Sequence, residues 1–462
     1  MAAVRSSEIL MDQTPDIAAT RLPGDVLARN FADAHPPLTA NQAIIEAERC
    51  YFCHDAPCIE ACPTGIDIPS FIHKIASGNL RGSARTILES NILGGSCARV
   101  CPTEILCEGK CVRNTQDARP IQIGALQRHA TDWQMAHGGQ PFARAAATGR
   151  RVAVVGAGPA GLACAHRLAM HGHDVDVYDA RPKAGGLNEY GVAAYKLADD
   201  FAQREIDFLL EIGGIVLHPD HCLGRDITVP SLREDHDAVV LTLGHAGVRS
   251  PGLAGQDLAG VVSAVDFIAT LRASPTKADV PVGRRVVVIG GGNTAVDAAV
   301  QARRLGADEV TMVYRRGADH MSATTVEQEW AQTNGVTIRH WAAPTDIRGA
   351  DGSVTGVAFT QGAPGADGRP VYDGLSFTVA ADMVLLAVGQ VFVADPLEGS
   401  GVSLAGGRIL VDGAGRTTVP GVYAGGDCTP GPDLTVSAVR DGRDIAEQIH
   451  ADLMSHPPLQ KA

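Results

Sequence analysis

Eight of the eleven cysteines lie between Cys50 and Cys111, in two closely spaced groups. The first group reads C-x2-C-x4-C-x3-C-P and ends at Cys62, and the second reads C-x3-C-P-x4-C-x3-C and begins at Cys97. Such thiols can form disulfides, bind zinc, act in catalysis or hold iron–sulfur clusters. Zinc sites usually show two separated C-x-x-C pairs, whereas a run ending in Cys-Pro is typical of ferredoxins. The pattern favours two [4Fe–4S] clusters, with zinc as a minor alternative and disulfides as a weaker one.

The composition limits the class of protein that carries these thiols. The chain has 462 residues, 45% of them hydrophobic and 4% aromatic, which suits two or three α/β domains. Basic residues number 39 and acidic residues 52, a net charge of −13 that argues against nucleic acid and acidic membranes as partners. The N-terminal segment lacks the apolar core of a signal peptide, and no later run is long enough to span a bilayer. We expect a soluble, cytoplasmic protein, in which clustered cysteines are seldom disulfides.

The segment around the cysteines has a helical pattern. Apolar residues recur at helical spacing after a possible cap at Thr39 or Asn41, and Pro69 stands where the first turn of a helix tolerates proline. A link rich in glycine and alanine follows. We therefore expect residues 1–144 to form a small α-helical iron–sulfur domain.

A β-α-β pattern begins after this link. Gly156, Gly158 and Gly161 form G-x-G-x-x-G between a buried strand and a helix, a turn that brings backbone close to a pyrophosphate at a helix N-terminus. Asp179 ends the next strand, where an acid accepts hydrogen bonds from the ribose hydroxyls. The first predicted set of dinucleotide-binding residues is Gly156, Gly158, Pro159, Ala160, Gly161 and Asp179.

A second unit of this kind starts at residue 284. Gly290 and Gly292 stand in the turn, Ala295 takes the place of the third glycine, and the following strand leads into Arg315 and Arg316. Arginine at this edge can pair with the 2′-phosphate of NADP, which a carboxylate would repel, although two solvated arginines are the competing interpretation. The predicted nicotinamide-nucleotide residues are Gly290, Gly292, Asn293, Thr294, Arg315 and Arg316.

The C-terminal region completes the pattern of a flavoprotein with two dinucleotide domains. A strand leads into Gly426-Asp427 and a helix starts near Leu434 or Thr435, so that its N-terminus would face the flavin ring. The further predicted FAD residues are Gly186, Leu187, Lys196, Gly426, Asp427, Thr435 and Val436. We expect an α/β fold with two Rossmann-type domains, in which the NAD(P)H domain (251–390) is inserted into the FAD domain (145–250 and 391–462).

A reduced flavin must pass its electrons to an acceptor. Cys164, Cys222 and Cys428 stand alone in the dinucleotide regions, without the C-x-x-C pair of disulfide reductases, and we interpret them as buried small residues. The acceptor is therefore expected in the cysteine-rich domain. No residue is required as a general acid here, so we predict no catalytic side chain, and His54 and the other histidines are interpreted as solvated or structural.

Three stretches together carry a resemblance to a known family: "CYFCHDAPCIEACPTGIDIPSFI", "GGSCARVCPTEILCEGKCVRN" and "IQIGALQRHA". They resemble the N-terminal iron–sulfur domain of dihydropyrimidine dehydrogenase, and the dinucleotide motifs follow in the same order. The chain ends where the long eukaryotic enzyme continues into an FMN barrel, so it resembles the separate NAD(P)H-oxidising subunit of the bacterial enzyme and, more distantly, the small subunit of glutamate synthase.

The resemblance implies a ligand set for each cluster. The first cluster would take Cys50, Cys53, Cys58 and Cys111, and the second would take Cys62, Cys101, Cys107 and Gln127. Cys97 would then be a spare thiol, whereas spacing alone favours Cys97 over Gln127. Ser322 stands where the mammalian enzyme carries an arginine, and the bacterial members include NADH users, so NADH and NADPH both stay open.

The resemblance also implies a function. Hydride from NAD(P)H would pass to FAD, and the clusters would relay electrons to an FMN- and iron–sulfur-containing partner subunit that reduces uracil or thymine to the 5,6-dihydro form. A glutamate synthase large subunit or a ferredoxin remains an alternative partner. A non-catalytic metal-binding scaffold is a further alternative, disfavoured by two intact nucleotide turns.

Overall fold

The computed structural model describes residues 16–365 and 369–455, which form two compact units. Within the described residues, the first unit consists of residues 16–30, 250–323 and 327–387. The second unit consists of residues 31–249, 324–326 and 388–455. The second unit therefore contains all the clustered cysteines and the glycine turn at residues 156–161. The first unit contains the glycine turn at residues 290–292.

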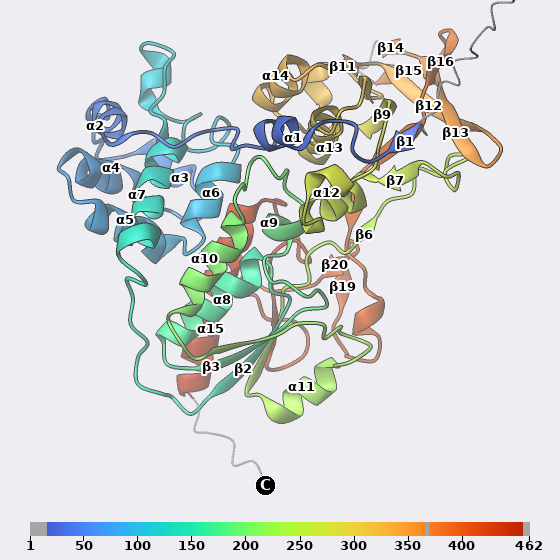
Figure 1. Ribbon diagram of the computed structural model, residues 1–462. Coiled ribbons are helices and arrows are strands. Elements are labelled where there is room, and N and C mark those ends of the chain that lie inside the picture. The colour runs from blue at the N-terminus through green and yellow to red at the C-terminus, as the bar shows by residue number, and fades with distance from the viewer. Residues whose placement is uncertain (1–15, 366–368, 456–462) are drawn as a thin grey trace, which may run out of the picture. The chain divides into compact units, whose positions relative to one another are not determined.

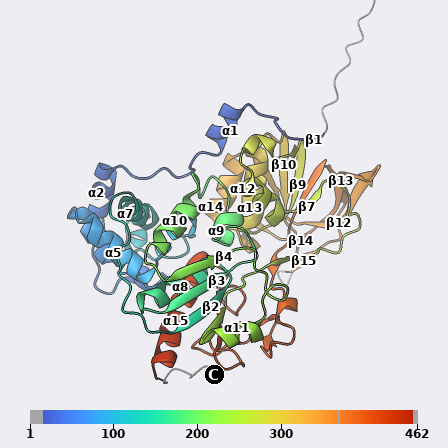
Figure 2. The same ribbon diagram turned by 60° about the horizontal axis from the view of Figure 1, so that its bottom comes forward.

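A parallel five-stranded sheet forms the framework of the second unit (Figures 1 and 2). Its order is β21-β5-β2-β3-β4, and every neighbouring pair is parallel. Helices α8 and α15 pack together against it, and Val152 and Val154 of β2 share a core with Val439 of α15. The elements are β2 (Arg151–Val155), α8 (Pro159–Met170), β3 (Asp174–Tyr178), β4 (Ile215–His218), β5 (Ala238–Leu241), β21 (Val422–Ala424) and α15 (Thr435–Ser455).

Short helices around the cysteines form the other part of the second unit. They are α2 (Ala40–Glu48), α3 (Pro57–Glu60), α4 (Ile68–Ala76), α5 (Leu80–Ser90), α6 (Gly94–Val100), η1 (Val112–Thr115) and α7 (Ile123–His137). Thr39 caps α2 with a full capping box, and Pro69 lies in the first turn of α4, so both predicted helix starts are confirmed. Phe71, Ile87 and Leu126 are fully buried, in a core continuous with that of α8 and β2.

The segment in which the chain leaves the second unit lies beside the segment in which it returns. Strand β6 (Gly247–Val248) pairs antiparallel with β18 (Gln390–Val391), which places the two crossings next to each other. The remaining elements of this unit are α9 (Leu187–Tyr190), α10 (Phe201–Leu210), α11 (Val229–Asp235), η4 (Asp395–Leu397), β19 (Leu404–Ala405) and β20 (Arg408–Ile409). An insertion between paired crossings lets the inserted part fold around its own core.

The first unit has a second parallel five-stranded sheet, of order β11-β10-β9-β17-β7. An antiparallel sheet, β12-β13-β16, and a short hairpin, β14-β15, extend from it. Its elements are β7 (Val261–Ser263), α12 (Ala264–Ala273), η2 (Lys277–Asp279), β8 (Val282–Gly283), β9 (Arg285–Gly290), α13 (Asn293–Arg304), β10 (Glu309–Val313), η3 (Ala318–His320), α14 (Thr325–Thr333), β11 (Val336–Arg339), β12 (Ala342–Ala350), β13 (Ser353–Gln361), β14 (Ala363–Pro364), β15 (Pro370–Val371), β16 (Ser376–Ala380) and β17 (Met383–Ala387).

Residues 16–30 pack with the first unit, although the expected boundaries group them with the cysteine segment. Strand β1 (Ile17–Ala18) pairs antiparallel with β8. Helix α1 (Gly24–Asn30) ends at Asn30, whose side chain donates to the Arg304 carbonyl at 2.8 Å while Arg304 donates back to the Asn30 carbonyl at 2.7 Å. Residues 1–15 and 456–462 of the expected outer domains lie outside the described residues.

Two parallel sheets with crossover helices and a helical cysteine segment confirm the predicted α/β fold class. Among the described residues, no helix has both the length and the apolar character needed to cross a membrane.

Candidate functional site

The first glycine turn leaves no room for a side chain at Gly156 or at Gly161. Gly156 has a φ of +107°, and a Cβ there would lie 2.2 Å from the Thr242 carbonyl oxygen. A Cβ on Gly161 would lie 1.9 Å from the carbonyl oxygen of Gly156. Gly158 is the N-cap of α8, and no side chain caps that end. Pro159, Ala160 and Gly161 open the helix, so its first N–H groups are available to a phosphate.

Asp179 follows β3 at the same edge of the sheet. Its carboxylate accepts a hydrogen bond from the N–H of Ala157 at 2.7 Å and another from the N–H of Arg181 at 2.9 Å. Burial raises the pKa of Asp179 above its usual value, and the two N–H donors oppose that rise. These hydrogen bonds hold the carboxylate against the glycine turn, where the ribose of a bound dinucleotide would lie.

Segments far apart in sequence converge on this turn. A Cβ on Gly186, whose φ is +52°, would lie 2.8 Å from the Cα of Gly158, and a Cβ on Gly426 would lie 3.0 Å from the Cβ of Ala160. Thr435 opens α15 and donates to the side-chain oxygen of Asn188 at 3.4 Å. The predicted residues Gly158, Ala160, Gly186 and Gly426 therefore form one close-packed cradle of backbone.

Four further predicted residues lie in these same segments. Leu187 opens α9 directly after Gly186, and Lys196 follows in a half-buried position. Val436 is buried in the first turn of α15. Burial and the neighbouring Asp433 raise the pKa of Asp427 to about 6, although Arg408 opposes the shift. A carboxyl with that pKa changes protonation close to neutral pH.

The second glycine turn has the same construction inside the first unit. Gly290 has a φ of +155°, and a Cβ there would lie 2.3 Å from the Ala387 carbonyl oxygen. Gly292 is the N-cap of α13 without a side-chain cap, and Asn293 and Thr294 open the helix. The hydroxyl of Ser322 lies against this turn, 3.1 Å from the position of a Cβ on Gly292.

Arg315 and Arg316 follow β10 with exposed side chains. Within the described part of the chain, neither guanidinium has an ion pair or a side-chain hydrogen bond. Two adjacent guanidinium groups that have no acidic partner among the described residues are suited to bind a phosphate.

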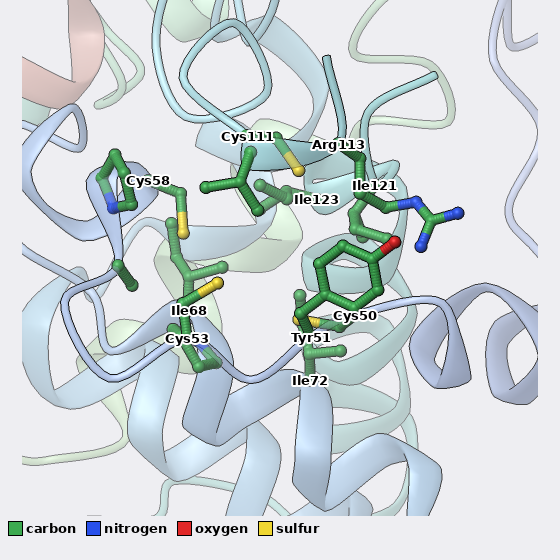
Figure 3. Close-up of a pocket in the computed structure, with 14 residues that line it drawn as sticks. Cys50, Tyr51, Cys53, Cys58, Ile68, Ile72, Cys111, Arg113, Ile121 and Ile123 are labelled. Carbon is green, nitrogen blue, oxygen red and sulfur yellow. The ribbon is translucent and has the colours of Figure 1, made fainter. Parts of the chain in front are cut away.

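Four of the clustered cysteines line one pocket (Figure 3). Cys50, Cys53 and Cys58 come from the first cysteine group, and Cys111 reaches the pocket from the end of the second group. Figure 3 shows their sulfur atoms around the pocket, with isoleucine side chains such as Ile68 and Ile123 among them. This set contains the four residues expected to hold the first cluster.

The other cysteines form a second neighbourhood. Cys101 directly follows α6 as its C-cap and interacts with Cys97, Cys107 and Cys62. Gln127 lies buried on α7, which packs against α6, and its side-chain amide donates to the Gly94 carbonyl at 2.7 Å. Gln127 is therefore anchored one helical turn before Cys97.

Burial and neighbouring thiols raise the pKa values of several cysteines in both groups. Burial raises the pKa of Cys58 to about 12, with Cys50 and Cys111 adding to the rise. A hydrogen bond with Cys97, together with burial, raises the pKa of Cys101, and burial raises that of Cys107. Buried thiols grouped in this way gain favourable partners when they bind iron as thiolates. Among the described residues, no three metal-binding side chains are close enough to share a single ion.

Comparison with known proteins assigns a family to this arrangement. Residues 150–442 match the model of the pyridine nucleotide-disulphide oxidoreductases, and residues 27–139 match that of dihydropyrimidine dehydrogenase domain II with a 4Fe-4S cluster. The chain belongs to the pyridine nucleotide-disulphide oxidoreductase family. It is an NAD(P)H-dependent oxidoreductase that binds FAD and NAD(P)H and carries a 4Fe-4S domain.

Curated relatives cover nearly the whole chain. The glutamate synthase [NADPH] small chain of Azospirillum brasilense is 34% identical over 92% of this chain and 92% of its own length. The NAD-dependent dihydropyrimidine dehydrogenase subunit PreT of Escherichia coli O157:H7 is 35% identical over 91% of this chain and 97% of its own length. The chain is thus about equally similar to an NADPH-linked and an NAD-linked protein.

Solved structures share the fold of the dinucleotide regions. Mycobacterium tuberculosis FprA in complex with NADPH aligns with a TM-score of 0.56 at 22% identity, over 66% of this chain and 85% of its own. Thioredoxin reductase of T. acidophilum aligns with a TM-score of 0.51 at 24% identity, over 66% of this chain and 99% of its own. Both likenesses support the Rossmann-type fold.

Two residues that the sequence did not single out connect the cysteine helices to the dinucleotide fold of the second unit. Glu205 of α10 accepts hydrogen bonds from the N–H groups of Gly95 and Ser96, at 2.8 and 3.0 Å. Arg443 of α15 donates to the carbonyls of Thr64 and Ser90, at 2.8 and 2.9 Å. Charged residues on amphipathic helices resemble solvated ones in sequence, so only their hydrogen bonds in the fold reveal this role.

Proposed function

We propose that this protein is the NAD(P)H-oxidising subunit of a two-subunit dihydropyrimidine dehydrogenase. Electrons from NAD(P)H pass through FAD and two [4Fe–4S] clusters to an FMN- and iron–sulfur-containing partner, which reduces uracil or thymine to the 5,6-dihydro form. A reducing, cytoplasmic compartment suits this chemistry and the many clustered thiols. The observation that carries the proposal is the pocket shared by Cys50, Cys53, Cys58 and Cys111 in a chain with two glycine turns.

Each part of the chain has its own role in this proposal. Residues 1–144 would hold the clusters, residues 145–250 and 391–462 FAD, and residues 251–390 the nicotinamide nucleotide. Gly156, Gly158 and Gly161 admit the FAD pyrophosphate, and Asp179 accepts hydrogen bonds from its ribose. Asp427 and the start of α15 at Thr435 and Val436 face the flavin. The close approach of Gly186 to Gly158 supports this assignment, because a side chain at either position would fill the cradle.

The two neighbourhoods of thiols support the proposed cluster ligands. The first cluster takes Cys50, Cys53, Cys58 and Cys111, which line one pocket. The second takes Cys62, Cys101 and Cys107, which interact with one another. Gln127 is its fourth ligand. Donation of the Gln127 amide N–H to Gly94 supports this choice, since it leaves the amide oxygen for iron.

Nicotinamide selection in this proposal depends on the arginine pair. Gly290, Gly292, Asn293 and Thr294 receive the pyrophosphate, and Arg315 and Arg316 pair with the 2′-phosphate of NADPH. Among the residues that the structure describes, neither guanidinium group has an acidic partner, which supports this preference. The similarity to an NAD-dependent relative keeps NADH as the competing donor.

Glutamate synthase small subunit is the second candidate function. The 34% identity to the Azospirillum brasilense small chain favours it as directly as the 35% identity to PreT favours the pyrimidine enzyme. The two candidates share the cofactors and differ in the partner. A ferredoxin partner would also use the same cofactors.

Anaerobic affinity purification of this chain from its own cells tests the proposal. The proposal expects a co-purified FMN-containing partner and NAD(P)H consumption that depends on uracil or thymine. A glutamine-hydrolysing partner, with NAD(P)H consumption that depends on glutamine and 2-oxoglutarate, would replace the pyrimidine reaction with glutamate synthesis. Purified protein without flavin and iron would contradict both functions.

A further inference from the structure

The loop that carries Arg315 and Arg316 is held by residues from the antiparallel part of the first unit. The N–H of Ala342 donates to the Tyr314 carbonyl at 3.2 Å, and the N–H of Trp341 donates to the Arg316 carbonyl at 3.1 Å. The hydroxyl of Tyr372 donates to the carbonyl of Arg315 between them. Three consecutive carbonyls of the arginine loop therefore accept hydrogen bonds from outside the β-α-β unit.

Trp341, which donates to the arginine loop, has a strained backbone conformation. Its φ is +58°, a left-handed value that is unfavourable for any residue with a Cβ. In this conformation its N–H reaches Arg316 while its carbonyl accepts from the N–H of Gly362 at 2.6 Å. The indole lies on Gly317, because a Cβ there would be 2.7 Å from Cζ2 of Trp341. The strained backbone of Trp341 is thus maintained at the place where its N–H and its indole contact the arginine loop.

Tyr372 follows β15 and also contacts the loop, through its hydroxyl. Its ring lies against Gly362, where a Cβ would be 2.6 Å from Cδ1 of the tyrosine. Burial raises the pKa of the Tyr372 hydroxyl, although Arg315 and Arg316 oppose the rise. The hydroxyl therefore keeps its proton at neutral pH and donates it to the carbonyl of Arg315.

The guanidinium groups themselves are not fixed by any acid in the described part of the chain. Their placement therefore depends on the backbone that carries them. A receptor whose backbone is already in place loses less entropy on binding an anion than a mobile loop does. In a protein of net charge −13, this loop carries two adjacent positive charges that have no acidic partner among the described residues.

We propose that Trp341 and Tyr372 are positioning residues that hold Arg315 and Arg316 for the 2′-phosphate of NADP(H), so that discrimination between NADPH and NADH depends on them. The inference rests on the proposed function, in which the arginine pair meets the 2′-phosphate. It adds that the selectivity is set by two aromatic residues outside the dinucleotide motif.

Binding of adenosine 2′,5′-bisphosphate and of AMP to the full-length holoprotein, measured by calorimetry, tests the inference, since the two ligands differ only in the 2′-phosphate. Wild type should bind the bisphosphate at least about 10-fold more tightly. Tyr372→Phe should weaken the bisphosphate about 3- to 10-fold, as expected for one lost hydrogen bond, and change AMP binding less than about 2-fold. Trp341→Gly, which tolerates the left-handed backbone but removes the indole, should act in the same direction.

Thr333→Val is the matched control, because it removes another hydroxyl of the first unit that donates to a backbone carbonyl, that of Glu329 at 2.9 Å. It should leave both affinities unchanged. Equal weakening of both ligands by Tyr372→Phe, or an unchanged preference in both aromatic variants, would overturn the inference alone. Equal affinity of the wild type for both ligands would overturn the inference together with the 2′-phosphate assignment of the proposed function.

Discussion

Glu205 accepts hydrogen bonds from Ser96 through both of its carboxylate oxygens. The N–H of Ser96 lies 3.0 Å from Oε1, and its hydroxyl donates to Oε2. Ser96 lies in the first turn of α6, which ends before Cys101, and Glu205 belongs to α10 of the flavoprotein fold. A buried carboxylate thus connects the dinucleotide fold to the helix that carries Cys97, the first thiol of the second group.

Glu205 should make the stability of the folded protein depend on pH. Burial raises its pKa to about 7 from 4.5, against the opposing hydrogen bonds from Ser96 and Gly95. A carboxyl with a raised folded pKa stabilises the fold fully below the unfolded pKa, and this contribution is lost as pH rises toward the folded pKa. The protein should lose stability on the order of 3 kcal/mol from this group between about pH 4.5 and pH 7.

Glu205→Gln should flatten that dependence, because the amide oxygen still accepts from the backbone and carries no charge. Thermal unfolding of both proteins between pH 5 and pH 8, without oxygen, measures the difference. Glu234→Gln, at an exposed position of α11, is the control and should follow the wild type. A Glu205→Gln curve parallel to that of the wild type would contradict the role of this carboxyl.

Cys111→Ser should remove the first cluster and leave the second. Cys111 lines the same pocket as Cys50, Cys53 and Cys58, although it is distant from them in sequence. We expect about half of the iron to be lost, with flavin content unchanged, because serine is a poor ligand for these clusters. Iron, sulfide and flavin assays measure this. Cys222→Ala removes a half-buried cysteine outside both groups and should keep all the iron.

Gln127→Ala should change only the second cluster. The electron-spin signal of that cluster, in the chemically reduced protein, should shift or disappear while the signal of the first cluster stays the same. Unchanged signals from both clusters would exclude Gln127 as a ligand and favour Cys97, whose side chain already contacts Cys101.

Gly161→Ala should abolish FAD binding. The added Cβ would lie 1.9 Å from the backbone oxygen of Gly156, and backbone cannot move aside as a flexible side chain can. Flavin per chain should fall at least about 10-fold. Gly413→Ala has nothing within 4 Å of the added Cβ and should retain flavin at the wild-type level.

The sequence predicted the parts whose chemistry depends on local motifs. The strand, turn and helix around Gly156 and around Gly290 follow from short-range geometry. Both β-α-β motifs form as expected. The start of α15 at Thr435 was also predicted to within one residue. Such glycine patterns predict the local structure directly, because only glycine fits where one backbone segment closely approaches another within a turn.

The rest depends on contacts between distant segments, which leave little local signal. Nothing around Glu205 distinguishes it from a solvated glutamate, and nothing around Trp341 indicates a left-handed backbone. The pairing of β1 with β8 likewise joins two very short strands. Spacing also gives no means of deciding which cysteines share a cluster, whereas the fold brings Cys111 to the pocket of the first group.

The most direct test of the central claim is whether electrons leave this subunit through the cysteine helices. The measurement compares the co-purified complex of the wild type with that of Cys58→Ser, both without oxygen. We expect the variant to keep flavin, partner and oxidation of NAD(P)H by ferricyanide, which can accept electrons directly from flavin, but to lose oxidation that depends on the partner's substrate. A Cys58→Ser complex that lacks the cluster yet turns over that substrate at the wild-type rate would contradict the relay.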